Sequence, residues 1–402
     1  FLVVIFLSTF KSSIAFDVKK DVVGWLKCFF LLIFFINLIF FLNKKNYYKI
    51  SNYILFIIYL LIIDTFLQRF FNFEILGNEM IIGRLTGPYH KELIVGGIIL
   101  IMGFVPLVYK IKKYLSEKKF IKSQLLLNFF FLSVFITGER MNTLLSLLAM
   151  VLLLFSIIKY KKFILSFLVI YFLSVSTIAL NYKYNGEKYF LKRYESFLFL
   201  LKTTENYCGD ITKGAVQEES CEKYKEFLKP EDLIVKKREK LTILDNAWAA
   251  HFLTAFEIWK DHKFIGAGNK AFRYLCHEYD NINSKRKDIR CSTHPHNFYF
   301  EIISEFGVIG LFLFLALILS IFFKTLKNLV IIYKDKSKDF VENYKFEYRL
   351  IIALLIIFIV LIWPIKSTGR LSSTIYGGLF WINILFLCSL NYRIKKIINK
   401  LM

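Results

Sequence analysis

Residues 294–323 of the chain read HPHNFYFEIISEFGVIGLFLFLALILSIFF. A polar segment with two histidines ends here, and an apolar run begins that is long enough to cross a bilayer. A membrane-spanning helix needs about 20 predominantly apolar residues, so the stretch predicts a helix whose first turn lies at a membrane surface. An imidazole at that surface is suited to proton transfer, because its charge changes near neutral pH.

Apolar runs of this length recur along the 402 residues, of which 56% are hydrophobic, and the mean hydropathy is +0.50. This composition predicts an all-α polytopic membrane protein. We expect about ten spans, with the stretch 1–16 as the end of one and the others near 25–42, 50–67, 93–109, 120–137, 141–158, 163–181, 298–323, 349–365 and 374–391.

The chain starts at Phe1 rather than Met, and no basic region precedes its first apolar run. A signal peptide would carry such a basic region. We therefore expect a fragment that has lost one or more N-terminal spans.

Basic residues divide the loops into two sets. If alternate loops lie on opposite sides, one set holds 23 Lys or Arg and the short loops of the other set hold 8. The positive-inside rule places the richer set in the cytoplasm. Topology and contact with anionic lipids therefore explain the net charge of +23, and a nucleic-acid groove is not needed to explain it.

The topology divides the chain into three parts: N-terminal transmembrane helices over 1–181, an outward loop domain over 182–297, and C-terminal transmembrane helices over 298–402. Residues 244–260 of the loop domain repeat apolar residues at helical spacing, which predicts a helix along the membrane interface. Residues 205–240 are charged and turn-rich, with little hydrophobic periodicity.

Four of the six cysteines lie in the outward loop, where an oxidising compartment favours disulfides. Four cysteines allow three pairings, and proximity favours Cys208–Cys221 and Cys276–Cys291. Four free thiols and a metal site are the alternatives. The CxxC spacing that is typical of zinc sites is absent from the sequence.

Arginine is prominent in the outward loops, whereas the cytoplasmic loops contain mostly lysine. Arg84 lies in the outward loop 68–92, and Arg140 lies in a tight outward turn between two spans. Since guanidinium forms bidentate pairs with phosphate oxygens and ammonium does not, these arginines predict an anionic lipid headgroup as ligand. The alternatives are that Arg140 pairs with Glu139 or snorkels outward, and that Arg84 is an ordinary loop charge.

The residues around His296 resemble a known family. His296-Asn297, nine further residues and Gly307-Val-Ile-Gly310 are similar to the O-antigen ligase motif, although Leu313 stands where that motif has a third glycine. Thr137-Gly-Glu-Arg140 resembles the arginine-containing turn of the family, and the segment around Arg84 resembles its outward arginine loop. Gly266-x-Gly268 followed by Phe272-Arg273 also resembles a segment that precedes the histidine motif in this superfamily.

The resemblance implies a metal-independent, inverting glycosyltransferase with a GT-C-like fold and no cofactor, in the bacterial inner membrane with its active site facing the periplasm. The implied donor is a glycan on undecaprenyl diphosphate, the implied acceptor is lipid A–core, and membrane lipids are the other partners. His296 would act as the catalytic base, and Arg140 and Arg84 would stabilise the departing diphosphate. The expected substrate-binding residues are Asn297, His294, Arg273 and Glu305, and the expected structural glycines are Gly307 and Gly310.

Three rival interpretations stay open, and one of them is a relative that transfers its glycan to a protein hydroxyl. An O-antigen polymerase of the same superfamily would use the same donor and a second lipid-linked glycan as acceptor; its Arg-x₁₀-Gly signature is absent here, because Arg84 misses by one position with Gly96. A polysaccharide flippase or other transporter would show internal repeats and charges near the bilayer midplane.

A metal site is the alternative for the histidine pair. His294 and His296 as half of such a site would need carboxylate partners, and the sequence shows no such cluster.

Overall fold

The computed structural model describes residues 44–78, 80, 83–89, 94–184, 190, 194, 207–210, 214–217, 233–235, 247–280, 282, 290–334, 338–364, 366, 369–371, 373 and 375–401. The expected spans at 1–16 and 25–42 lie outside these residues, so the count of about ten spans stays a prediction.

The described part is mainly helical. Its helices are α3 (Lys44–Phe71), α4 (Val95–Ser116), α5 (Phe120–Ile136), α6 (Arg140–Ser156), α7 (Lys161–Tyr184), α10 (Ala247–Asp261), α11 (Ala271–Leu275), α12 (Phe298–Lys334), α13 (Lys338–Leu361) and α14 (Tyr376–Leu401), with a 3-10 turn η1 at Gly87–Tyr89.

Several helices are suited to a bilayer. Within the described residues, four segments have the length and apolar composition of a membrane span: Asn46–Phe71, Val95–Ser116, Lys161–Tyr182 and Phe298–Ile332. Helices α5 and α6 are apolar but shorter. A helix satisfies all its backbone hydrogen bonds internally, which a hydrocarbon environment requires. The chain is therefore a multi-pass membrane protein.

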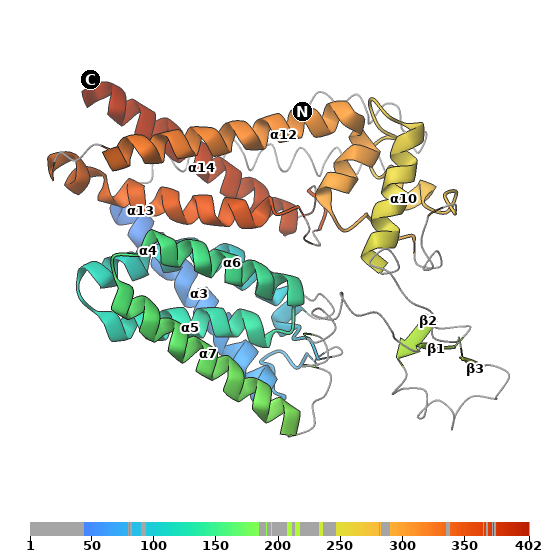
Figure 1. Ribbon diagram of the computed structural model, residues 1–402, viewed down its shortest axis with the longest axis horizontal. Helices are drawn as coiled ribbons and strands as arrows, with labels where there is room; N and C mark the ends of the chain where they lie inside the picture. Colours follow the sequence, from blue (N-terminus) through green and yellow to red (C-terminus); the bar gives the residue numbers. More distant parts are fainter. Residues whose placement is uncertain are drawn as a thin grey trace.

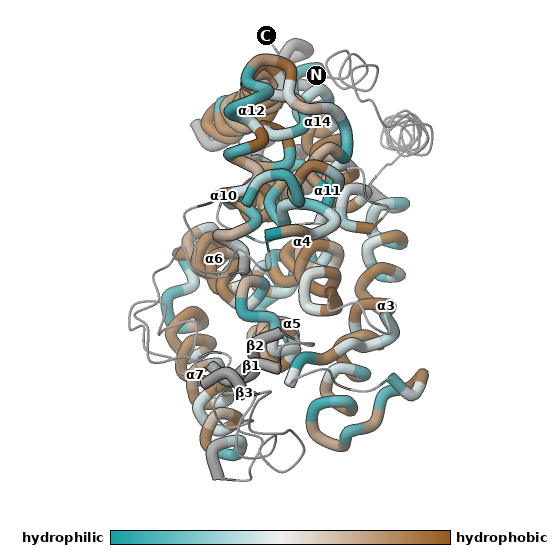
Figure 2. The backbone as a smooth tube through the Cα atoms, turned by 90° about the vertical axis from the view of Figure 1, so that its right-hand side faces the viewer, coloured by the Kyte–Doolittle hydropathy of each residue, from teal (hydrophilic) through white to brown (hydrophobic). Residues whose placement is uncertain are grey.

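The helices form two groups that meet at α4. Figure 1 shows α3–α7 in one group and α12–α14 in the other, and α4 contacts α3, α5 and α13. Most of α4 is buried, whereas α3 and α7 keep many apolar side chains exposed. Their tubes are largely hydrophobic in Figure 2, as expected of faces that meet lipid, whereas hydrophilic segments gather around α10 and α11.

The loops alternate between the two ends of the helical bundle. Figure 1 places the α5–α6 turn and α10 at one end, and the α6–α7 and α12–α13 connections at the other. This alternation agrees with the division of the loops that the basic residues predict.

A small antiparallel sheet departs from the all-α expectation. It consists of β1 (Tyr207–Asp210), β2 (Gly214–Gln217) and β3 (Leu233–Val235) in the order β2-β1-β3, with Cys208 opposite Val216 and Val235. The segment has no apolar face at helical spacing, so its backbone groups pair across short strands instead.

Helix α12 bends at Gly307, whose φ of 68° and ψ of −169° are not helical. The expected span 298–323 therefore begins with a separate piece, Phe298–Phe306, before the long membrane segment. Further along α12, buried amides tie it to α14: Asn328 donates to Asn391 Oδ1 at 2.7 Å, and Asn391 donates to Thr325 Oγ1 at 2.7 Å.

Candidate functional site

His296 lies two residues before α12 in an uncommon backbone conformation. Its φ is 57°, in the left-handed region that non-glycine residues rarely adopt. The ring is partly buried, and its Nε2 lies 2.9 Å from the hydroxyl oxygen of Ser292. A hydroxyl group therefore already occupies hydrogen-bonding distance from this nitrogen.

Three further rings surround His296. The ring centroid of His294 lies 4.2 Å away, that of Trp248 4.8 Å in an edge-on arrangement, and that of His251 5.3 Å. Trp248 and His251 belong to α10, and their spacing of three residues places both on the face of the helix that meets His296. The fold thus gathers three of the six histidines in one cluster.

The cluster keeps His296 neutral. Burial, with smaller contributions from His294 and His251, lowers the pKa of His296 to about 3. Burial also lowers the pKa of His251, opposed by its hydrogen bond to the Arg290 carbonyl. Both imidazoles are therefore uncharged at neutral pH, and a neutral imidazole accepts a proton.

Asn297 fastens the first turn of α12. Its Oδ1 accepts from the backbone N–H of Tyr299 at 2.9 Å, which is the contact of a helix N-cap. Its Nδ2 donates to the carbonyl oxygens of Pro364 and Lys366 at 2.6 and 3.3 Å. The side chain is buried and connects α12 to the loop before α14, so its contacts here position the backbone next to His296.

The motif glycine Gly307 meets the Gly266-x-Gly268 segment. The backbone N–H groups of Ala267 and Gly268 donate to the carbonyls of Ser304 and Glu305, and that of Val308 donates to Lys263 at 2.8 Å. These bonds hold α12 at its bend against the loop that follows α10. Two glycine segments that the sequence shows 40 residues apart thus form one contact, and Gly310 is buried one turn further on.

Glu305 lies in a buried ion-pair network. Arg370 donates from Nε to Glu301 Oε1 at 3.0 Å, and its guanidinium reaches Glu305 Oε2 and Asn269 Oδ1 at 3.4 Å. The Glu305 side chain is 1% exposed. Its contacts connect the bend of α12 to the loop before α14, and substrate binding by Glu305 stays a prediction.

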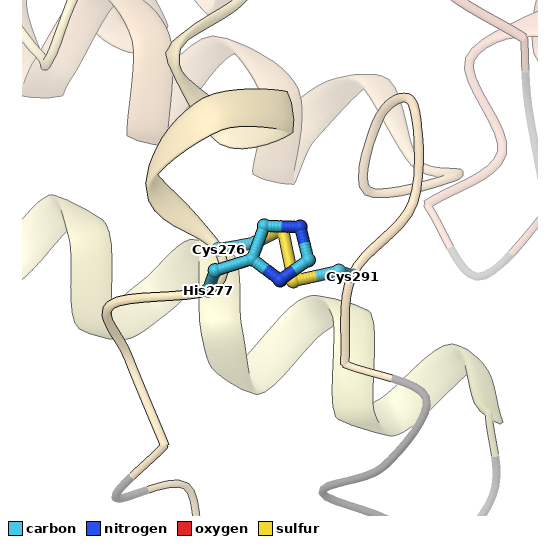
Figure 3. Close-up of side chains that lie close together, drawn as sticks. All are labelled: Cys276, His277 and Cys291. Carbon is cyan, nitrogen blue, oxygen red and sulfur yellow. A yellow bond between two sulfur atoms is a disulfide. The ribbon is translucent and has the colours of Figure 1, made fainter.

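A disulfide joins Cys276 to Cys291, and Figure 3 shows the His277 ring beside it. These three side chains are close enough to hold a metal ion, but thiolate ligands are needed for that, and both sulfurs are bonded to each other. Cys221 lies outside the described residues, so the pairing Cys208–Cys221 stays a prediction.

Arg273 lies one turn before the disulfide on α11. Its carbonyl oxygen lies 3.7 Å from the disulfide-bonded Cys276 Sγ, and its Nε is buried with no hydrogen-bond partner among the described residues. The structure thus places Arg273 on α11 beside the disulfide, and its role in substrate binding stays a prediction.

The other expected catalytic residues, Arg84 and Arg140, lie close enough to influence each other. Burial, and to a smaller extent the positive charge of Arg140, lowers the pKa of Arg84, whereas the Glu139 carboxylate acts in the opposite direction. Arg140 is the first residue of α6, so its guanidinium stands at the positive end of the helix dipole. Together these charges make an anion-attracting position.

The Glu139 side chain is buried and lies close enough to Arg84 to interact with it. Its carboxylate accepts from the backbone N–H of Gly96 at 2.8 Å and from the amide of Asn142. Burial raises the pKa of this carboxyl group, although its hydrogen bonds and Arg84 oppose the shift. The acid therefore connects the α5–α6 turn to the start of α4.

Arg69 holds the two arginine-bearing segments together, and sequence analysis missed it. Its Nε donates to the carbonyl of Ile136 at 2.8 Å and its NH2 donates to that of Gly83 at 2.9 Å. The guanidinium also lies over the ring of Phe190, 4.5 Å from the centroid. The only sign in the sequence was an arginine two residues after the predicted span 50–67; its burial and its place in the last turn of α3 come from the structure.

The two clusters stand at the same end of the bundle. Figure 1 places the start of α6, the α5–α6 turn, α10 and the first part of α12 together at that end. His251, Ser292 and Arg370 join the clusters through tertiary contacts, and sequence analysis gave none of them a role in the site. The Trp248–His251 spacing on one helix was the only local sign for His251.

Part of the chain that carries these residues matches a known protein family. Residues 125–315 match the model of the O-antigen ligase family. The matched region includes Arg140, His251, His296 and Gly307, while Arg84 lies before it. No curated protein matches the chain. The family resemblance of the sequence is thereby confirmed, and the family is one of ligase-type or polymerase-type enzymes of lipopolysaccharide synthesis.

Proposed function

Since residues 125–315 match the O-antigen ligase family, we propose that the protein transfers a glycan from undecaprenyl diphosphate to lipid A–core at the periplasmic face of the inner membrane. The observation that carries this proposal is the neutral imidazole of His296 with a hydroxyl at 2.9 Å from Nε2. The first part of α12 stands at the same end of the bundle as the start of α6 (Figure 1), where α6 begins with Arg140, and Arg84 lies close enough to Arg140 to interact with it.

His296 has the properties of a general base for this reaction. A hydroxyl of the acceptor sugar takes the position that Ser292 Oγ holds, and His296 Nε2 accepts its proton as the oxygen attacks the anomeric carbon. The pKa of about 3 keeps the base unprotonated at rest. The negative charge of a bound diphosphate raises that pKa during the reaction, since an opposite charge favours the imidazolium.

The two arginines stabilise the leaving group. As the new C–O bond forms, the bond between the anomeric carbon and the diphosphate oxygen breaks, and negative charge grows on the diphosphate. Arg140 at the N-terminus of α6 and the nearby Arg84 offer two positive charges that stabilise the leaving diphosphate. Direct displacement in one step inverts the configuration at the anomeric carbon.

The polymerase alternative uses the same donor and the same chemistry, and it differs only in the acceptor. The transporter alternative does not call for a base. The site supports a transferase because His296 is both neutral and hydrogen-bonded to a hydroxyl. We favour the ligase because one long segment lies between α7 and α12 and because the Arg-x₁₀-Gly spacing is absent from the sequence.

The test is complementation of a strain that lacks its ligase with the full-length gene, either wild type or His296→Ala. The wild type should move the accumulated lipid-linked polymer onto lipid A–core, whereas His296→Ala should insert into the membrane and transfer nothing. Long glycan on lipopolysaccharide from the His296→Ala strain would overturn the base assignment. A null strain that carries single repeats on core would instead identify a polymerase.

A further inference from the structure

His251 is a buried imidazole that the proposed reaction does not use. Only 7% of it is exposed, and its Nδ1 lies 3.0 Å from the carbonyl oxygen of Arg290. A carbonyl only accepts, so Nδ1 carries the hydrogen and Nε2 carries the lone pair of the neutral ring. The contact therefore fixes the tautomer of His251.

The carbonyl that fixes His251 is itself anchored. The Arg290 guanidinium donates from Nε to the carbonyl of Cys276 at 3.1 Å and from NH2 to that of His277 at 3.0 Å. The next residue, Cys291, is bonded to Cys276. The segment 290–292 is thus held to the end of α11 at three points, and Ser292 at its end reaches His296.

The backbone conformation of His296 is intrinsically unfavourable. A φ of 57° is disfavoured for residues with a β-carbon, so the surroundings must hold it. His251 and Trp248 provide these surroundings from α10, at 5.3 and 4.8 Å between ring centroids. Both rings lie more than 40 residues earlier in the sequence, so the tertiary fold and not the neighbouring chain brings them to His296.

We propose that His251 is a positioning residue for His296: a neutral imidazole with a fixed tautomer that, together with Trp248, holds the His296 ring with Nε2 toward the acceptor hydroxyl. This inference rests on the proposed function for its catalytic consequence. The arrangement of the two rings is a property of the fold and is measurable without any transfer reaction.

The neutrality of His251 matters for the charge that His296 gains. Among the described residues, the groups that face His251 are Trp248, Phe272, His296 and the Arg290 carbonyl, with His294 beyond His296. The Arg290 guanidinium is engaged by the carbonyls of residues 276 and 277. A neutral His251 does not repel the imidazolium that forms at His296, whereas a protonated one would.

Three substitutions separate positioning from packing. His251→Asn retains an amide N–H near the place of Nδ1, so its bond to the Arg290 carbonyl survives. His251→Phe keeps an aromatic ring but loses that bond, and His251→Ala removes both. His262→Asn, just beyond the end of α10, is the matched control. We expect transfer to fall on the order of 10- to 100-fold in His251→Ala, less in His251→Phe, and least in His251→Asn.

The first readout is the pH profile of transfer. In wild type the acid side of the profile should lie below the usual range of histidine, and in His251→Ala it should move to higher pH, because part of the burial that lowers the pKa of His296 is removed. A variant that merely loosens packing would lose rate at every pH alike. An unshifted profile in His251→Ala would overturn the proposal.

The second readout does not depend on transfer. Diethyl pyrocarbonate modifies only neutral imidazole, and mass spectrometry of the peptide around 294–296 reports its rate at His296. An imidazole of ordinary pKa reacts about tenfold faster at pH 7.5 than at pH 5.5. We expect a ratio near one for wild type and a several-fold higher ratio for His251→Ala.

The two readouts distinguish the possible failures. If His251→Ala labels like wild type at both pH values, the positioning proposal is wrong whatever the activity. If labelling changes as expected but His296→Ala still transfers glycan, the proposed function of His296 fails while the ring arrangement stands.

Discussion

The backbone of Gly307 packs directly on that of Gly266, so that a β-carbon on Gly307 would lie 2.5 Å from the Gly266 nitrogen and 2.2 Å from the Phe264 carbonyl oxygen. The φ of 68° and ψ of −169° at Gly307 belong to a region that is essentially restricted to glycine. A β-carbon on Gly266 would in turn lie 2.3 Å from the Phe306 nitrogen, so the bend of α12 depends on the absence of a side chain at both positions.

Gly307→Ala should lower both stability and transfer. The backbone strain alone costs about 1–3 kcal/mol, and the clash with backbone atoms adds to it. Thermal unfolding of the purified protein in detergent checks the first effect and lipopolysaccharide analysis the second. Gly378→Ala is the control, because a β-carbon there meets nothing within 4 Å. Equal unfolding temperatures for the two variants would contradict the prediction.

Arg140→Lys should impair transfer although it keeps the positive charge, because an ammonium lacks the planar fork that binds two phosphate oxygens. We expect a rate loss of about tenfold or more, by comparison with the loss of a single stabilising donor. Arg349→Lys is the matched control, because Arg349 of α13 donates to Ser116 Oγ at the C-terminal end of α4, away from the start of α6. Full activity of Arg140→Lys would remove the argument for a diphosphate clamp.

Cys291→Ser should destabilise the protein by about 3 kcal/mol, since the disulfide closes a loop with a sequence separation of 15. The substitution should also free the segment that holds Ser292 near His296. Unfolding measured with and without a reducing agent tests this: reductant should destabilise the wild type and leave Cys291→Ser unchanged. Cys388→Ser, a cysteine without a disulfide, should behave like the wild type.

Removal of Arg370 should be costly because it leaves two buried carboxylates without their shared cation. Breaking a buried ion pair in this way costs about 3–5 kcal/mol, so Arg370→Met should unfold at a clearly lower temperature. The triple variant Arg370→Met, Glu301→Gln and Glu305→Gln should recover much of the loss, as both charges are gone. A triple variant as unstable as the single one would show that the charges are not the cause.

The protein should lose stability as the pH falls below the ordinary histidine pKa of about 6.5. The folded-state pKa of His296 is lowered to about 3, so between these two values the unfolded chain binds a proton that the folded protein does not. More protons bound in the unfolded state means that stability rises with pH in this window. Thermal unfolding at pH 5 and pH 7 should differ more for wild type than for His296→Phe, and an equal difference would contradict the assignment.

Much of the fold was predictable because local composition indicates where the helices form. The apolar runs predict helices near 120–137 and 141–158, and the structure has α5 and α6 there with the Arg140 turn between them. The helix expected at 244–260 is α10. The strands were not predictable, since residues 205–240 have no local pattern that separates short strands from irregular loop.

The site was predictable in part. His296 and the glycines at 307 and 266 stand in a sequence pattern, whereas His251 carries no pattern of its own, and only its distance from His296 gives it a role. Glu305 illustrates the same limit: the sequence places it near the start of a predicted helix, but its partner Arg370 lies 65 residues later.

The sequence by itself determined that the chain is a multi-pass helical membrane protein and which family motif it carries, because hydropathy, basic loops and motif spacing are properties of neighbouring residues. Only the tertiary structure decided which of six histidines meet, which carbonyl fixes His251, and that Gly307 rests on Gly266. These facts depend on how α10 packs against the start of α12, and side-chain packing between distant segments leaves no periodic trace in the sequence.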